Sequence, residues 1–236
     1  MGYQKELPHR TTQNRKGKNP QSPQKIRTGN QTQTPPFPMK KITAKDFYQM
    51  ISEKPSVFEH WDTPLEITEY VNCEDSRLTH LSKHLTFSGK NKFGNSADFS
   101  DCKNLEIATG TFHGFVSFAA SGIQKIENLQ TGVNKQGNSV SFGNCKSLKV
   151  ATGTYPGFAS FYGSGIHSIQ NLEIQNPDKE KYFAHFKGCS QLHTLQGWDL
   201  SKKIKIEPEK REAEINRRAS LKKFLVTITP KELPFL

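Results

Sequence analysis

The sequence predicts a mainly β repeat solenoid with coils of 19–25 residues, short helical caps at both ends and a disordered N-terminal tail. The motif F-x-x-C-x-x-L begins at Phe99, Phe142 and Phe186. A second motif, F-x-x-S-G-I-x-x-I, begins at Phe118 and Phe161, so the two motifs alternate along the chain. The five phenylalanines are 19, 24, 19 and 25 residues apart. A repeated spacing of this size is typical of stacked coils rather than of one irregular globular domain.

The repeat positions predict the interior of this solenoid, because side chains that recur once per coil form ladders in which each coil covers its neighbour. These positions are Phe99, Cys102, Leu105, Phe118, Ser121, Ile123, Ile126, Phe142, Cys145, Leu148, Phe161, Ser164, Ile166, Ile169, Phe186, Cys189 and Leu192. The serines and cysteines in this set are small enough to lie at a corner of the coil. We expect their hydroxyl and thiol groups to bond there to free backbone N–H groups.

The half-repeat that contains Ser121 and Ser164 resembles a leucine-rich repeat, with Ser where Asn or Cys usually stands. The half-repeat that contains the cysteines resembles the bacterial variety of leucine-rich repeat called BspA-like. The resemblance covers roughly residues 65–200, which we assign to the solenoid. It implies only that the protein binds other proteins, as such repeats usually do.

Residues 1–41 are predicted to form the disordered basic tail. They contain nine Lys or Arg residues against one Glu, and apolar residues are sparse. Such a segment buries too little apolar surface to offset the entropy lost on ordering. The alternatives are contact with nucleic acid or an acidic partner, and a leader that a secretion apparatus recognises.

Residues 42–64 are predicted to form the N-terminal helical cap. Thr43 can cap a helix that runs to Lys54, since Asp46 stands three residues later in a capping-box arrangement and Pro55 ends the helix. Phe47, with Met50 and Ile51, falls on one face of that helix. We expect the helix to cover the first coil, because the end of a repeat stack must be shielded from water.

Two further features recur between the coils. The segment from Ala108 to Phe115 returns at residues 151–158, and its paired glycines predict a tight turn rather than a phosphate-binding loop. Polar loops at Thr131–Asn138 and Gln175–Lys181 occupy matching places in successive units. Loops of this kind are where partners often bind.

Residues 201–236 are predicted to form the C-terminal cap helix and a short tail. Trp198 should cover the last coil. The stretch from Glu207 to Leu225 has acidic residues early and basic residues late, as the helix dipole favours. An apolar stripe is expected to hold this helix against the solenoid, and consists of Ile215, Ala219, Leu221, Phe224 and Leu225.

The cysteines are predicted to be buried free thiols. If each unit of 43 residues is two coils, equivalent cysteines lie roughly 10 Å apart, whereas a disulfide needs Cα atoms within about 7 Å. Free thiols favour a reducing compartment, and no apolar run suggests a signal peptide or a membrane span. We therefore expect a cytoplasmic protein, with export by a non-classical route as the alternative.

No catalytic, cofactor or metal motif stands out in the sequence. His80 and His84 have the spacing of metal ligands on a helix, but they fall in a predicted coil. The predicted function is therefore a non-enzymatic protein-interaction module. One alternative is a nucleic-acid accessory protein that binds phosphate through residues 1–41 and 202–223, since the net charge of +11 is concentrated at the two ends. A secreted bacterial effector is a further alternative.

Overall fold

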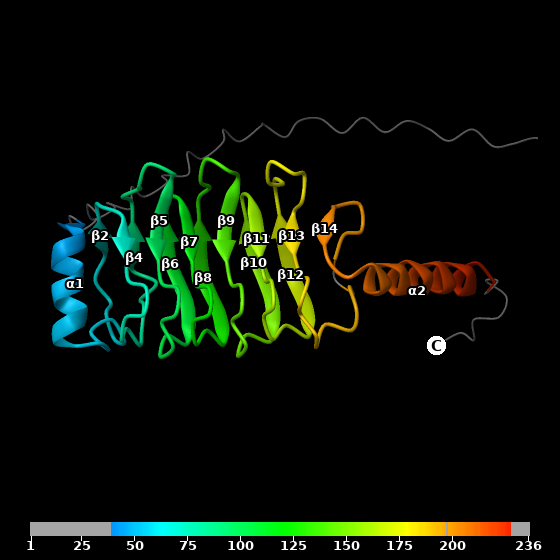
Figure 1. Cartoon of the computed structure of the whole chain (residues 1–236), viewed down its shortest axis with the longest axis horizontal. Coiled ribbons are helices and arrows are strands. Elements are labelled where there is room, and N and C mark those ends of the chain that lie inside the picture. The colour runs from blue at the N-terminus through cyan, green and yellow to red at the C-terminus, as the bar shows by residue number, and fades with distance from the viewer. Residues whose placement is uncertain (1–38, 197, 228–236) are drawn as a thin grey trace, which may run out of the picture. The chain divides into compact units, whose positions relative to one another are not determined.

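The computed structural model describes residues 39–196 and 198–227, with side chains to Ser220. The predicted tail up to residue 38, the C-terminal tail Pro230–Leu236, and the side chains of Leu221, Phe224 and Leu225 lie outside this description. Within it, parallel strands stack into a β-solenoid of about seven turns, which confirms the predicted fold class (Figure 1).

Each turn of the solenoid contributes one strand to each of two opposite sides. The first side holds a five-stranded sheet, β1 (Lys40–Ile42), β2 (Leu65–Ile67), β4 (Leu85–Phe87), β6 (Ile107–Phe112) and β8 (Lys125–Thr131), and a two-stranded sheet, β10 (Val150–Tyr155) and β12 (Ser168–Ile174). The second side is one seven-stranded sheet, β3 (Val71–Asn72), β5 (Asn95–Asp98), β7 (Phe115–Ser117), β9 (Asn138–Ser141), β11 (Phe158–Ser160), β13 (Ala184–His185) and β14 (Ile204–Lys205).

A column of phenylalanine rings fills the space between the two sides. Adjacent rings from Phe99 to Phe186 are stacked nearly parallel, with centroids 5.2–5.6 Å apart. Stacked aromatic pairs add about 0.5–1.5 kcal/mol each to the free energy gained by burial. The column ends on Trp198, whose ring meets Phe186 edge-on and is 2% exposed, as expected for a residue that covers the last coil.

The prediction of a tight turn at the paired glycines was wrong for the first glycine of each pair. Gly110 and Gly153 lie inside β6 and β10, where the register shifts and φ is 103° and 110°. A left-handed φ favours glycine, and a one-residue bulge is the usual reason for it within a strand. The corner itself follows at the second glycine, where Gly114 N donates to Ser96 Oγ at 2.7 Å.

The first side of the solenoid is interrupted between β8 and β10. At the corner of each coil an N–H normally reaches the carbonyl of the preceding coil, as His113 N does to Phe87 O at 3.0 Å and Gln175 N does to Tyr155 O at 2.9 Å. Pro156 occupies this position opposite Thr131 and has no N–H to donate. Within the described part of the chain no ladder joins β8 to β10, so the sheet ends there.

The N-terminal end is covered as predicted. Helix α1 (Ala44–Glu53) begins with a capping box in which Thr43 N donates to Asp46 Oδ2 at 2.9 Å and Asp46 N donates to Thr43 Oγ1. These bonds lower the pKa of the Asp46 carboxyl. Phe47 stacks on Phe58 and meets Phe87 edge-on. Strand β1 begins at Lys40, so the last residues of the predicted tail belong to the folded unit.

The C-terminal helix α2 (Pro208–Thr227) contacts the solenoid through charged groups, and the two described residues of the predicted apolar stripe, Ile215 and Ala219, are exposed. Ile215 is 47% exposed, whereas Glu214 is buried and binds Arg217 and Arg218 at 2.7 and 2.6 Å. Arg218 in turn donates to the backbone carbonyl of Trp198. The last coil has no following coil to bond its carbonyls, so a guanidinium donor stabilises this end better than an aliphatic side chain would.

Candidate functional site

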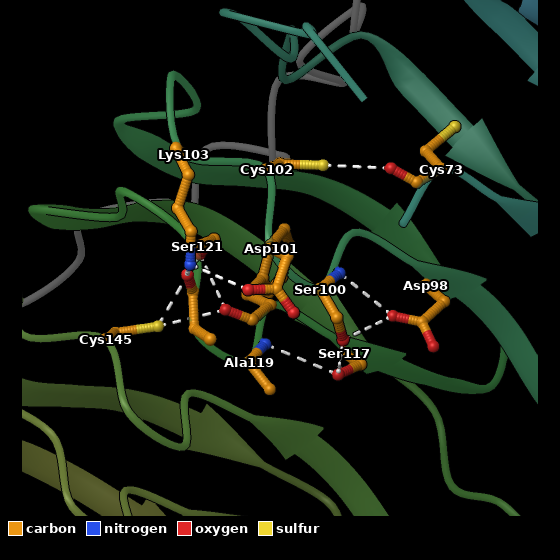
Figure 2. A network of polar contacts seen from close by, with 12 residues as sticks. Cys73, Asp98, Ser100, Asp101, Cys102, Lys103, Ser117, Ala119, Ser121 and Cys145 are labelled. Atoms are coloured by element: carbon orange, nitrogen blue, oxygen red, sulfur yellow. Dashed lines mark hydrogen bonds and ion pairs between the residues drawn. The ribbon is translucent and has the colours of Figure 1, made fainter. Parts of the chain in front are cut away.

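The cysteines and serines of the repeat form a ladder at one corner of the coils. The thiols of Cys102, Cys145 and Cys189 donate to carbonyls of preceding coils, for example Cys145 Sγ to Phe118 O at 3.0 Å. Ser121 Oγ donates to the same oxygen and lies 3.5 Å from the Cys145 sulfur (Figure 2). The predicted bonds to free N–H groups were therefore wrong. Corner N–H groups such as that of Phe118 are already bonded to neighbouring coils.

This ladder is unsuited to nucleophilic chemistry. All four cysteines are free and buried. Burial is the largest effect on each thiol and raises its pKa above the ordinary value. Because the thiolate is the reactive form, these groups serve as small packing residues. The other repeat positions are likewise buried, apart from Ile126, which packs partly exposed against the core.

A second polar network fixes the neighbouring corner, and Figure 2 shows it beside the thiols. Ser100 Oγ donates to Asp98 Oδ1 at 2.6 Å and lies 2.8 Å from Ser117 Oγ. Ser117 Oγ also accepts from Ala119 N. Carboxylate and hydroxyl groups are used here to hold backbone in place, which is the usual role of such local bonds.

Metal binding finds no support in the described part of the chain, where no group of three or more His, Cys, Asp or Glu residues could hold an ion. His80 lies outside any helix, and its Nδ1 is 2.9 Å from Thr79 Oγ1. His84 is also non-helical. The helical spacing that makes such a pair a metal site is therefore missing.

The polar loops between the coils contain a repeated turn that sequence analysis missed. Asn134 Oδ1 accepts from the N–H groups of Gln136 and Asn138, and its N–H donates to Asn138 O at 2.9 Å. Asn91 and Asp178 hold the equivalent loops in the same way. The recurrence of Asn91-Lys92 as Asn134-Lys135 at the repeat spacing was the available signal. Asx turns of this kind order the loops that were expected to bind partners.

A hollow of about 440 Å³ lies where β8 and β10 fail to pair. Its lining comes from both strands and is uncharged: Ile126, Asn128, Leu129, Gln130, Thr131, Thr152, Gly153 and Thr154. The Thr131 hydroxyl is buried and has no hydrogen-bond partner among the described residues. A buried hydroxyl without a partner is costly, so the missing ladder leaves a polar defect beside this hollow.

The two strands beside the hollow are not hydrogen-bonded to each other. Each of β8 and β10 has one partner strand, β6 and β12 respectively. Their backbones nevertheless remain close together, so the break leaves no room for an added strand between them. The exposed side chains of Gln130 and Thr154 stand on opposite sides of the break.

The described residues contain no helix long and apolar enough to cross a membrane. Comparison with known proteins yields no matching family model, no matching curated protein and no matching solved structure.

Proposed function

We propose that this chain is a protein-interaction module whose partner binds the outer surface of β8 and β10. The observation that supports the proposal is the interrupted ladder at Pro156, which leaves a hollow on an otherwise continuous strand surface. The interior offers no alternative, because the repeat side chains fill it. The resemblance to BspA-like repeats, which usually bind other proteins, favours the same function.

The chemistry of this surface favours a polypeptide partner. An extended segment of the partner would lie across the outer surface of β8 and β10, because the two strands are too close for another strand to enter between them. The uncharged lining around Gln130 and Thr154 matches the polar backbone of such a segment, and it lacks the charge that would select an ion. Ile126 and Leu129 add apolar contact for side chains of the partner.

Site-specific photo-crosslinking tests the proposal. A photoreactive residue is placed at Gln130 or Thr154 of the full chain, which is then irradiated in a nuclease-treated lysate of the source cells. We expect a discrete protein adduct from both positions that excess unlabelled chain competes away. The same residue at Lys45, exposed on α1, is the matched control and should give no such adduct.

A repaired sheet provides the second arm of the experiment. Pro156→His introduces the residue that stands at the equivalent place in the preceding unit, His113, whose N–H bonds to Phe87 O. Closure of the break should reduce the adduct at Gln130. Adducts from Lys45 alone, or adducts that form only in a parallel lysate without nuclease, would contradict the proposed site.

A further inference from the structure

Outward-facing residues of the seven-stranded sheet change in charge along the solenoid. Register pairs align one residue per strand from β3 to β14: Asn72, Asp98, Ser117, Ser141, Ser160, His185 and Lys205. The row therefore has its one acid, Asp98, on the second strand and its one lysine, Lys205, on the last, with serines between them. The positive charge of this row lies on the last strand, far from Asp98.

Aromatic rings alternate with cations at the basic end of this row. The Tyr162 ring, in a side chain 46% exposed, lies 5.0 Å from the His185 ring. Next along the register is Lys205, whose Nζ is 4.6 Å from the Tyr182 ring centroid, and Lys203 Nζ is 4.0 Å from the same centroid. We call Tyr162, His185, Lys205, Tyr182 and Lys203 the C-terminal strip.

Lysines outnumber acids in the segments that supply most of this strip. Residues 175–187 and 201–207 contain six lysines against three acids. Glu180 pairs with Lys205 at 2.7 Å and is 69% exposed, whereas Glu207 accepts the N–H of Gly188. The pKa of His185 is lowered, first by burial and then by Lys205 and Lys187, so its ring acts as a neutral aromatic group.

We infer that the C-terminal strip binds single-stranded nucleic acid, with Lys203 and Lys205 on phosphates and Tyr162 and Tyr182 against bases. Cations alone attract any polyanion, but aromatic rings between them add contacts that only an unstacked base provides. A duplex keeps its bases stacked and presents phosphate alone, so it should bind more weakly. An acidic protein lacks bases for the tyrosines and is a distinct outcome of the test.

Fluorescence anisotropy of the full chain with a labelled oligothymidylate of about 20 nucleotides tests this inference. For the wild type, affinity should fall steeply between about 50 and about 200 mM salt. In Lys203→Gln/Lys205→Gln, the slope of log affinity against log salt should become shallower by about 1.4, at about 0.7 for each lost phosphate contact. In Tyr162→Ala, affinity should fall about five- to hundredfold with an unchanged slope.

A matched lysine and aromatic elsewhere on the solenoid control for nonspecific effects. Lys92 Nζ lies 5.1 Å from the ring centroid of Phe93, which is 49% exposed. The variant Lys92→Gln/Phe93→Ala should retain wild-type affinity and slope. Inorganic polyphosphate, used as a competitor, should bind the lysine variant more weakly than the wild type. It should bind Tyr162→Ala as tightly as the wild type, since polyphosphate has no bases.

Three results with the oligothymidylate would overturn the inference. They are absence of oligothymidylate binding at low salt, equal losses in the Lys92/Phe93 control, and an unchanged affinity in Tyr162→Ala. Equal affinity for a duplex, or stronger binding of poly-glutamate than of oligothymidylate, would also reject it. The proposed protein-binding surface on β8 and β10 is independent of this strip, so either can fail alone.

Discussion

The repeat position of a cysteine in the ladder does not by itself make its thiol reactive. Cys102, Cys145 and Cys189 each donate to a carbonyl, and burial raises the pKa of all three thiols. We expect the native chain to react with Ellman's reagent only as fast as it unfolds, and to react at once in concentrated urea. Rapid modification of any cysteine in the native state would show that the coil corner opens locally.

Phe142 tests the aromatic column at the same scale. Its ring stacks between Phe118 at 5.6 Å and Phe161 at 5.5 Å and is fully buried. Phe142→Ala should lower the free energy of unfolding by about 3–5 kcal/mol, measured by urea denaturation. Phe93→Ala, at an exposed position, should change it by no more than about 0.5 kcal/mol. Similar losses in both variants would contradict the placement of the core.

At the scale of the element, Pro156 decides where one sheet ends. Pro156→His restores a donor opposite Thr131 O and removes the stiffness that proline gives the unfolded chain. These effects oppose each other, so the free energy of unfolding should change by less than about 1 kcal/mol. Hydrogen exchange is more informative, because the new amide at position 156 should be protected.

The reverse substitution supplies the comparison. His113→Pro removes the bond to Phe87 O and should destabilise the chain by about 1–3 kcal/mol, because a buried carbonyl loses its partner. Amides of β6 next to the new break should exchange faster. If the His113→Pro variant keeps wild-type stability and exchange, the corner bond is not what holds adjacent strands together.

Glu214 governs the attachment of α2. Its side chain is almost fully buried, and hydrogen bonds from Arg217 and Arg218 lower its pKa to about 2. A lowered folded-state pKa gives stability that is complete above the ordinary value of 4.5 and is lost as the pH falls from there towards 2. We expect Glu214→Gln to release α2 at neutral pH, seen as faster amide exchange of residues 208–220. Glu212→Gln, at an exposed position, should not.

The sequence was sufficient for the elements that repeat and insufficient for those that occur once. Phe142 and Cys145 recur at the coil spacing, so their burial could be predicted from periodicity alone. Pro156 matters because it cannot donate to a carbonyl in the preceding coil. Glu214 matters because it holds Arg218, which donates to a carbonyl of the last coil. No local sequence pattern reveals either relation. Helical apolar spacing favoured Ile215 as the anchor of α2, yet the exposed carbonyls at the end of the stack required a charged donor.

The candidate sites were predictable in part for the same reason. Charge counts pointed to residues 202–223, which include Lys203 and Lys205. The Tyr182 ring beside them comes from an earlier coil, and only stacking of the coils brings it near the lysines and brings Tyr162 against His185. The hollow between β8 and β10 had no counterpart in the sequence analysis, because a single proline in a loop motif does not by itself predict an interrupted sheet.

At the scale of the whole solenoid, the two ends are covered by different chemistry. The N-terminal end buries Phe47 against Phe58 and Phe87, and Tyr48 accepts the N–H of Asn72 at the edge of β3. The C-terminal end combines Trp198 with the charged contacts of Glu214 and Arg218. Acid should therefore loosen the C-terminal end more than the N-terminal end, because Glu214 is buried, whereas the capping carboxyl of Asp46 is exposed and aromatic packing does not titrate.

The interrupted ladder gives the solenoid a mechanical asymmetry. Beside the break, β9 and β11 on the opposite side remain hydrogen-bonded, and Cys145 still donates to Phe118 O of the preceding coil, so only the first side lacks its ladder there. A solenoid that lacks one ladder at a single point should resist twisting of its intact side but bend more easily at that point. We expect thermal bending to concentrate between β8 and β10. A ligand that bridges these two strands would therefore stiffen the solenoid at this point.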